Sequence, residues 1–236
     1  MSDPNQFRLR ITFVKQGRLA LLSHLEVARA LERAVRRSGL PFAVSNGFSP
    51  HMKLAFGAAL PVGVGGAREL ADLQLVRYVA PEDALAALKR ASVPDLMVTA
   101  CAYVEPKAPA ASAAFPISTY QVVLSAAPES LPIPAQVHVV RKKKEKVLDV
   151  AEFLVGEPVL RGRELTLSLE QKPTGSLRPD KLLAACLELM GHDESAVAAP
   201  VEVEQVVPNI EPEPAHGAAG DPLRVLSMTR IDQRSV

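Results

Sequence analysis

The sequence predicts an α+β fold built as two successive halves, and two patterns near its start favour this class. Residues 7–14 alternate apolar and polar side chains, which is the pattern of a half-buried strand. Residues 23–38 then place apolar side chains at helical spacing. Ser23 and Glu26 have the spacing of a capping box at the start of this helix, and Gly39 ends it.

The rest of the first half continues the alternation of strands and helices. We expect strands at 42–45, 69–79 and 96–104 and a helix at 81–89. A long glycine-rich loop, residues 46–66, joins the second strand to the third. The resulting order, strand–helix–strand–strand–helix–strand, is that of the split βαβ or ferredoxin-like arrangement.

A proline- and alanine-rich segment, residues 107–118, predicts a linker between a first domain at 1–106 and a second, smaller domain at 119–236. The second domain repeats the pattern less clearly. We expect its strands at 120–124, 137–141, 158–160, 164–169, 201–207 and 225–231, and its helices at 147–154 and 179–190. The predicted fold class is therefore α+β, with two tandem ferredoxin-like halves.

The composition excludes several classes of protein. With 48% hydrophobic residues and a net charge of +1 over 236 residues, the chain is not wholly disordered. It has no apolar run of the ~20 residues that a membrane span needs and no signal-peptide pattern, so we expect a cytoplasmic protein without membrane contact. Cys101 and Cys186 are too few for a disulfide framework, a four-cysteine zinc site or an iron–sulfur cluster. We therefore expect no metal and no cofactor in this chain.

The small net charge hides an uneven distribution. Residues 8–53 contain nine basic and two acidic residues, whereas every charge in 193–213 is acidic. Two groups of basic side chains stand out, one on the polar face of the first helix and one after a predicted strand. They are Arg29, Arg33, Arg36 and Arg37, and Arg141, Lys142, Lys143 and Lys144. Such groups bind a polyanion in some proteins and are simply solvated faces in others.

The glycine-rich loop and its flank hold a second candidate site. Small polar and basic residues that suit a phosphate cradle gather there, namely Ser45, Asn46, Gly47, Ser49 and Lys53. The alternative is an ordered loop that Phe48 and Phe56 anchor in the core. His51 is either a solvent-exposed loop residue or a ligand contact, whereas the helical spacing of His24 points it towards the sheet.

The segment 17–64 resembles the radical-SAM-linked protein family of bacteria, which occurs fused behind a cobalamin-binding radical SAM protein or encoded beside one. The resemblance rests on the SHL segment at Ser23, the helix end RRSGLP and the GFSPHMK loop at 47–53, and a later KPTGSLRPD stretch at 172–180 also fits. Ser49 and Met52 stand where the family usually has Asn and Pro. The resemblance implies a radical SAM partner and transfers no catalytic residue.

Three functions follow as hypotheses. The first is a non-catalytic accessory module that binds RNA and positions it for a separate radical SAM enzyme, in RNA modification or ribosome-related metabolism. In the second, the basic face docks an acidic surface of that partner without touching RNA. The third is a phosphoryl-handling or RNA-cleaving enzyme that uses His51 and Lys53.

Overall fold

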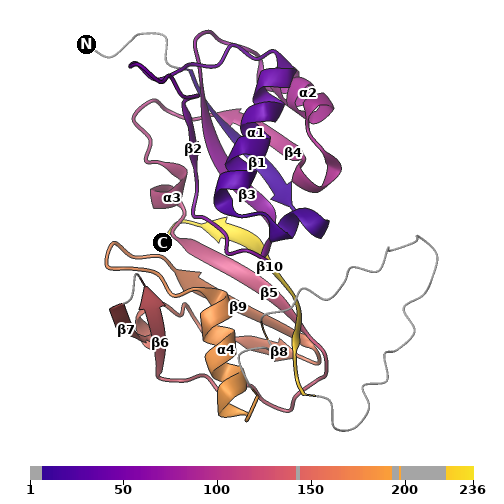
Figure 1. Ribbon diagram of the computed structural model, residues 1–236, viewed down its shortest axis with the longest axis vertical. Coiled ribbons are helices and arrows are strands. Elements are labelled where there is room, and N and C mark those ends of the chain that lie inside the picture. Colours follow the sequence, from indigo (N-terminus) through magenta and orange to yellow (C-terminus); the bar gives the residue numbers. More distant parts are fainter. Residues whose placement is uncertain (1–6, 142–143, 193–196, 198–221) are drawn as a thin grey trace, which may run out of the picture. The chain divides into compact units, whose positions relative to one another are not determined.

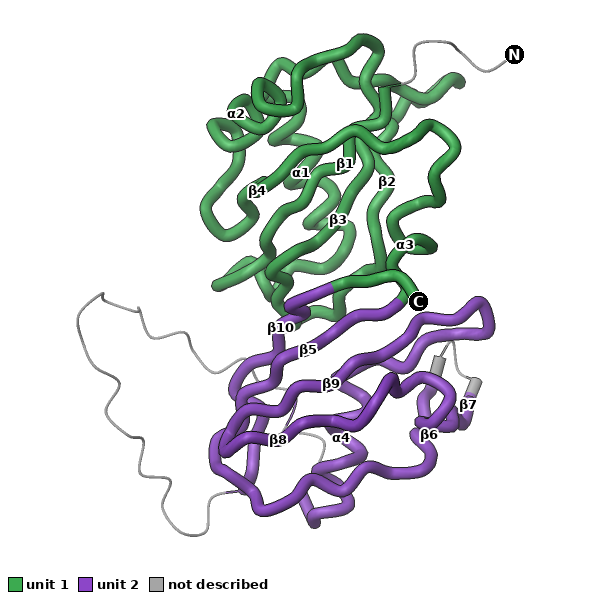
Figure 2. Tube along the Cα trace, turned by 180° about the vertical axis from the view of Figure 1, so that it is seen from behind, with its two compact units in different colours: residues 1–116, 233–236 green, residues 117–232 purple. Residues whose placement is uncertain are grey.

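The computed structural model describes residues 7–141, 144–192, 197 and 222–236 (Figure 1). Within these ranges the chain is a mixed α+β structure with four α-helices and a mostly antiparallel arrangement of strands. It divides into two compact units, Met1–Pro116 with Gln233–Val236, and Ile117–Asp232 (Figure 2). None of the helices in the described ranges is long and apolar enough to pass through a membrane.

The first unit follows the predicted order of strands and helices. Its elements are β1 (Phe7–Lys15), η1 (Gly17–Leu21), α1 (His24–Ser38), β2 (Leu54–Phe56), β3 (Gly65–Leu75), α2 (Pro81–Ala91), η2 (Pro94–Leu96), β4 (Val98–Tyr103) and α3 (Ala111–Ala114), where η marks a 3-10 helix. β1 pairs with β3 and β4, and β3 also pairs with β2, all antiparallel. The strands therefore lie in the order β4-β1-β3-β2.

Two strands of the first unit lie elsewhere than the sequence pattern predicts. Residues 42–45 form only isolated bridges, because a bridge between Val44 and Met52 folds this segment back on itself. The chain therefore reaches the edge of β3 later, and β2 lies inside the predicted 46–66 loop. β3 starts four residues before the expected 69–79, since two buried glycines that show no apolar pattern begin the strand and Gly66 pairs with β1.

The core of the first unit lies between the sheet and the two helices. Leu9, Ile11 and Phe13 alternate along β1 and are all buried. Their face is covered by apolar residues of α1 and α2, including Leu31 and Leu88, so both helices pack on the same side of the sheet. The opposite side of β1 carries Arg8 and Arg10, which contact the segment after β4.

The second unit contains one α-helix among the residues that the structure describes there. Its elements are β5 (Ile117–Leu124), β6 (Gln136–Arg141), β7 (Lys144–Asp149), η3 (Val150–Glu152), β8 (Val159–Arg161), β9 (Glu164–Glu170), α4 (Pro179–Leu189) and β10 (Val225–Arg234). β9 pairs antiparallel with both β5 and β8, and β10 lies next to β5. The strand order is thus β10-β5-β9-β8.

The helix predicted at 147–154 is wrong. β6 and β7 form a hairpin there, in which Val137 lies opposite Leu148 and both side chains are buried. Only residues 150–152 form a single 3-10 turn, where the Asp149 side chain accepts a hydrogen bond from the backbone of Ala151. The segment forms a strand although its apolar spacing also fits a helix, because the hairpin buries Val137 and Leu148 against each other.

The segment expected to be a linker at 107–118 has local structure of its own. It contains α3 and the first residues of β5. The last residues of the chain belong to the first unit, where the Gln233 side-chain amide donates a hydrogen bond of 2.8 Å to the carbonyl of Arg68. The strand predicted at 201–207 and the acidic segment 193–213 lie outside the described residues, apart from Val197.

Candidate functional site

Four arginines share the exposed side of α1. The helix starts at a capping box, in which the Ser23 hydroxyl accepts from the Glu26 N–H and the Glu26 carboxylate accepts from the Ser23 N–H. It ends at Gly39, which has a φ of +72°. The buried side holds Val27, Leu31, Ala34 and Val35. The opposite side exposes what we call the arginine face, Arg29, Arg33, Arg36 and Arg37.

The four arginines differ in what they contact within the chain. The Arg37 guanidinium donates a hydrogen bond of 2.6 Å to the carbonyl of Ala91. The Arg36 guanidinium lies over the ring of Phe42, at 5.4 Å from its centroid. In the part of the chain that the structure describes, Arg29 and Arg33 form no ion pair. The middle of the face therefore presents two exposed guanidinium groups to an incoming ligand.

The segment 45–51 after α1 forms a closed loop. The Ser45 N–H donates to the His51 carbonyl at 2.8 Å, and the His51 N–H donates to the Ser45 hydroxyl at 3.0 Å. Phe48 is fully exposed at the tip of this loop, so the alternative that both Phe48 and Phe56 anchor the loop in the core is wrong for Phe48, whereas Phe56 does pack against the core. Met52 is buried at that point instead, because the Val44–Met52 bridge turns it inward.

The loop brings the predicted polar residues together but uses part of their hydrogen-bonding capacity. The N–H groups of Ser45, His51 and Lys53 all donate within the chain, so they are not donors for a phosphate. Asn46, Gly47, Ser49 and His51 are exposed, and Lys53 is half-buried. Gly47 has a φ of +128°, a conformation that favours glycine. Among the described residues, no side chain forms a hydrogen bond with the His51 imidazole.

The second basic group lies in the other unit. Arg141 ends β6 and pairs with Lys144 at the start of β7, at the last described pair of the hairpin. Lys142 and Lys143 lie outside the described residues. The sequence-predicted basic residues thus belong to two separately described units, with the arginine face and the 45–51 loop in the first.

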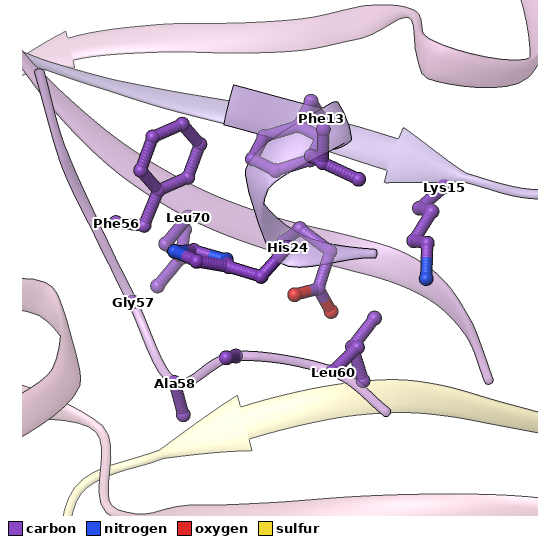
Figure 3. A pocket seen from close by; sticks show the side chains of 11 residues that line it. Phe13, Lys15, His24, Phe56, Gly57, Ala58, Leu60 and Leu70 are labelled. Atoms are coloured by element: carbon purple, nitrogen blue, oxygen red, sulfur yellow. The ribbon is translucent and has the colours of Figure 1, made fainter. Parts of the chain in front are cut away.

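A pocket of the first unit was not predicted from the sequence. It is small, since a water-sized sphere can enter only about 20 Å³ of it, and it is lined by the ends of β1 and β3, the first turn of α1 and the residues after β2 (Figure 3). Its lining residues are Phe13, Lys15, His24, Val27, Phe56, Gly57, Ala58, Ala59, Leu60, Glu69 and Leu70. We call it the His24 pocket.

Two buried charged residues and a histidine line this pocket. Lys15 is 2% exposed, and its ammonium donates to the carbonyls of Val64 at 3.2 Å and Pro61 at 3.5 Å. Glu69 is 6% exposed. His24, which helical spacing points towards the sheet, is exposed, and its ring meets the Phe56 ring edge to face at 5.2 Å. The alternation along β1 gives a signal for Lys15, since this residue continues the buried series of Ile11 and Phe13.

A buried ion cluster lies on the other side of the same sheet. Asp72 accepts hydrogen bonds from both Arg8 and Arg10, and Arg8 also donates to the carbonyls of Ala108 and Pro109. Burial alone would raise the pKa of Asp72, but the hydrogen bonds and charges of Arg10 and Arg8 outweigh burial, and the pKa is lower than usual. The cluster therefore ties the segment after β4 to the sheet.

The two cysteines are poor candidates for chemistry at neutral pH. Burial raises the pKa of the Cys101 thiol to about 11 and that of Cys186 to about 12. The thiolate is the reactive form, so both thiols are largely unreactive near pH 7. Cys101 lies on β4 of the first unit and Cys186 on α4 of the second.

Fold and site together define a mixed α+β protein with an exposed arginine face and a small pocket of mostly apolar lining. By its sequence the chain belongs to the family described as "Uncharacterized protein conserved in bacteria (DUF2344)", whose model matches residues 8–179. This match includes the arginine face, the 45–51 loop, the His24 pocket and the β6–β7 hairpin. A search of curated proteins finds no match.

Proposed function

We propose that this protein is an accessory module that binds RNA and works with a separate cobalamin-binding radical SAM enzyme, in RNA modification or ribosome-related metabolism. The observation that carries RNA binding is the pair of exposed arginines in the middle of α1, Arg29 and Arg33, which form no ion pair within the described residues. A guanidinium group suits phosphate because its planar N–H groups bind two oxygens at once.

The position of these arginines argues against a purely structural role. Arg36 and Arg37 lie in the last turn of α1, where positive charge stabilises the helix dipole. That effect falls off within one turn, so it does not account for Arg29 and Arg33. At the helix start, hydrogen bonds from Ser23 and the charge of Arg29 both lower the pKa of Glu26, so Arg29 has some attraction within the helix. A polyanionic ligand therefore explains Arg33, and part of the placement of Arg29, better than helix stability does.

The 45–51 loop adds a second kind of contact. Single-stranded RNA is bound through base stacking on aromatic side chains as well as through its phosphates. Phe48 presents a fully exposed ring on a loop whose base is closed by hydrogen bonds, which restrain the backbone that carries the ring. Exposed His51 ends this loop, and half-buried Lys53 follows two residues later, so both are near enough to supply polar contacts.

The radical SAM partner and the finer fold are also parts of the proposal. The partner follows from the resemblance of residues 17–64 and from the pairing with such enzymes that the resemblance implies. For the fold, each unit arranges four strands in one row, β4-β1-β3-β2 in the first and β10-β5-β9-β8 in the second. We take this as support for two ferredoxin-like halves, the second with the β6–β7 hairpin in place of the first helix.

Salt dependence tests RNA binding directly. The binding constant for a labelled single-stranded uridine homopolymer is measured by anisotropy between about 50 and 200 mM salt. We expect the affinity to fall steeply with salt, and the double substitution Arg29→Gln with Arg33→Gln to reduce the slope by about 0.7 for each phosphate that is no longer bound. Arg161→Gln with Arg224→Gln, which removes two exposed charges from the second unit, is the matched control. Binding that is flat in salt and equal in all three proteins contradicts the proposal.

One observation favours the second candidate, a scaffold that docks the partner protein. Leu25 is 67% exposed at the start of α1, and Leu21 and Val62 are also exposed. The Gly63 N–H donates to the Ala20 carbonyl, which holds the loop that carries Val62 beside η1. If Leu25→Asp abolishes association with the radical SAM enzyme while RNA binding is absent from the start, the scaffold function replaces the first.

A further inference from the structure

β4 is an edge strand of the first unit with few of the features that protect such an edge. It pairs with β1 on one side, and the described residues provide no strand on its other side. Natural edge strands are usually shielded by charged side chains, prolines or bulges. β4 contains no charged residue and no proline, and the irregularity in its pairing lies near its start, opposite Thr12 and Phe13. Residues 100–103 therefore form a regular and unprotected edge.

The backbone groups of two residues point to the open side of this edge. The Val104 N–H donates to the Arg8 carbonyl at 3.1 Å, and the pairing with β1 continues through Ala102. In an antiparallel pair, the residues that bond to the neighbouring strand alternate with residues whose N–H and C=O groups face the other way. Cys101 and Tyr103 are these alternate residues. Within the described ranges, their four backbone groups form no hydrogen bond on the open side.

Helix α2 lies beside β4 and carries opposite charges at its two ends (Figure 1). The start of the helix is near the end of the strand, since the Tyr103 hydroxyl donates to the carbonyl of Val79, just before the helix, at 2.9 Å. The end of the helix leads through η2 into the start of β4. Burial raises the pKa of the Cys101 thiol, and Lys89 lies close enough for its charge to oppose this effect. The charged residues of α2 are all exposed, and they are Glu82 and Asp83 in the first turn and Lys89 and Arg90 in the last.

The open edge and the charges of α2 both fit a second copy of the same chain. If two β4 strands pair antiparallel about a two-fold axis, Cys101 of each copy can lie opposite Tyr103 of the other, which uses all four open backbone groups of each strand. The two α2 helices then also run antiparallel, so the acidic end of each faces the basic end of the other. We propose that the protein forms a symmetric dimer in which the β4 edges of two copies pair and their α2 helices lie side by side. This inference goes beyond the proposed function and does not depend on RNA binding.

The test measures association of the full chain by sedimentation equilibrium. In the proposed pairing, exposed Ala102 of one copy lies opposite Ala102 of the other. Ala102→Lys and Ala102→Glu each bring like charges together, so each should weaken association at least about tenfold. A mixture of the two variants brings opposite charges together and should associate again. Ala55→Lys, at an exposed alanine of β2 in the same unit, is the matched control and should associate like wild type.

Helix α2 provides an independent test. Lys89→Glu with Arg90→Glu makes both ends of α2 acidic and should also weaken association, whereas Arg29→Glu with Arg33→Glu makes the same change of charge on α1 and should not. Each variant is checked for folding by circular dichroism and thermal melting. If neither Ala102 variant folds, the two helix variants decide the question.

Three results would overturn the inference. The first is a wild-type protein that stays monomeric at every concentration measured. The second is a dimer that the Ala102 and α2 variants leave unchanged, since another surface would then form it. The third is a mixture of Ala102→Lys and Ala102→Glu that stays monomeric, because position 102 would then not meet its own copy.

Discussion

Arg10 and Asp72 lie directly opposite each other across the β1–β3 pair, and the Arg10 Nε atom donates to Asp72 Oδ1 at 2.7 Å. Arg8, two residues earlier on the same face, donates to the second oxygen. One buried carboxylate therefore serves two guanidinium groups, and each of them also contacts the segment between β4 and β5. Asp72 therefore holds both arginines in the positions from which they bind the segment between β4 and β5.

Asp72→Asn should destabilise the protein strongly. The substitution leaves two guanidinium groups near a neutral amide, and removal of one partner from a buried ion pair costs about 3 kcal/mol or more. Urea unfolding measures the change as a lower midpoint. Asp180→Asn is the matched control, since its pair with Arg178 is more exposed and worth about 1 kcal/mol at most. An Asp72→Asn protein as stable as the control would show that the cluster contributes little.

Asp72 should also make stability depend on pH in the acid range. Its pKa in the folded protein lies below the ordinary value of 3.8, so the unfolded chain binds the proton more readily. The stabilisation is fully present above the unfolded pKa and disappears as the pH falls through the folded pKa. Unfolding free energies measured from neutral pH into the acid range should therefore fall less steeply below about pH 4 in Asp72→Asn than in wild type. Parallel curves would assign the acid sensitivity to other groups.

Neither cysteine should react with iodoacetamide in the folded protein at neutral pH. With pKa values of about 11 and about 12, Cys101 and Cys186 hold far less thiolate than a free cysteine, whose pKa is about 8.5. We expect labelling at least about 100-fold slower than in the urea-unfolded chain, as measured by mass spectrometry. Rapid labelling of Cys101 in the folded protein would mean that β4 opens locally.

Phe48 and Met52 should respond oppositely to truncation although they lie four residues apart. Phe48→Ala removes a fully exposed ring, so the free energy of unfolding should change by less than about 0.5 kcal/mol. Met52→Ala removes a buried side chain and should cost about 2–5 kcal/mol. The reverse order in urea unfolding would place Phe48 in the core and Met52 in solvent.

Phe48→Trp provides a direct reporter of RNA binding at the loop. The chain contains no tryptophan, so this variant has a single indole at the loop tip. Stacking of a base on the indole should quench its fluorescence on addition of the uridine homopolymer, and less so on addition of an abasic ribose-phosphate strand of the same length. Unchanged emission at saturating RNA would remove Phe48 from the interface.

Gly66→Ala should destabilise the first unit through Glu69. The new methyl group overlaps the Glu69 carboxylate, and such overpacking costs about 1–3 kcal/mol. In a Glu69→Ala background the overlap is gone, so the same substitution should cost much less. A double-mutant cycle on the free energy of unfolding measures this coupling. Additive effects would mean that the carboxylate moves aside freely.

Long and strongly patterned elements could be predicted from the sequence. The strand β1 and the helix α1 with its capping box and glycine end lie where alternation and capping place them. β2 could not be predicted because a strand of three residues is too short to show alternation. The apolar spacing of β7 fits a helix as well as a strand, and only its pairing with β6 decides between the two structures.

The candidate site was predictable only in part, for a related reason. Exposure of the arginine face follows from helical spacing, because the opposite side of α1 is apolar. The pocket brings together Lys15, His24 and Glu69 from three different elements. A local sequence pattern does not predict which residues of distant elements lie close together. The exposure of Phe48 could not be predicted either, because aromatic residues are usually buried. Here the bridge between Val44 and Met52 closes the loop and leaves the Phe48 ring in solvent.

The return of the C-terminal residues to the first unit matters to anyone who wishes to study that unit alone. A fragment cut after Pro116 would lack Gln233, whose amide satisfies the carbonyl of Arg68 on β3. The side chain of Gln233 also approaches Gly57, next to the pocket. Such a fragment is best supplied with residues 233–236 as a peptide, or joined to them through a short linker, and affinity tags are better placed at the N-terminus.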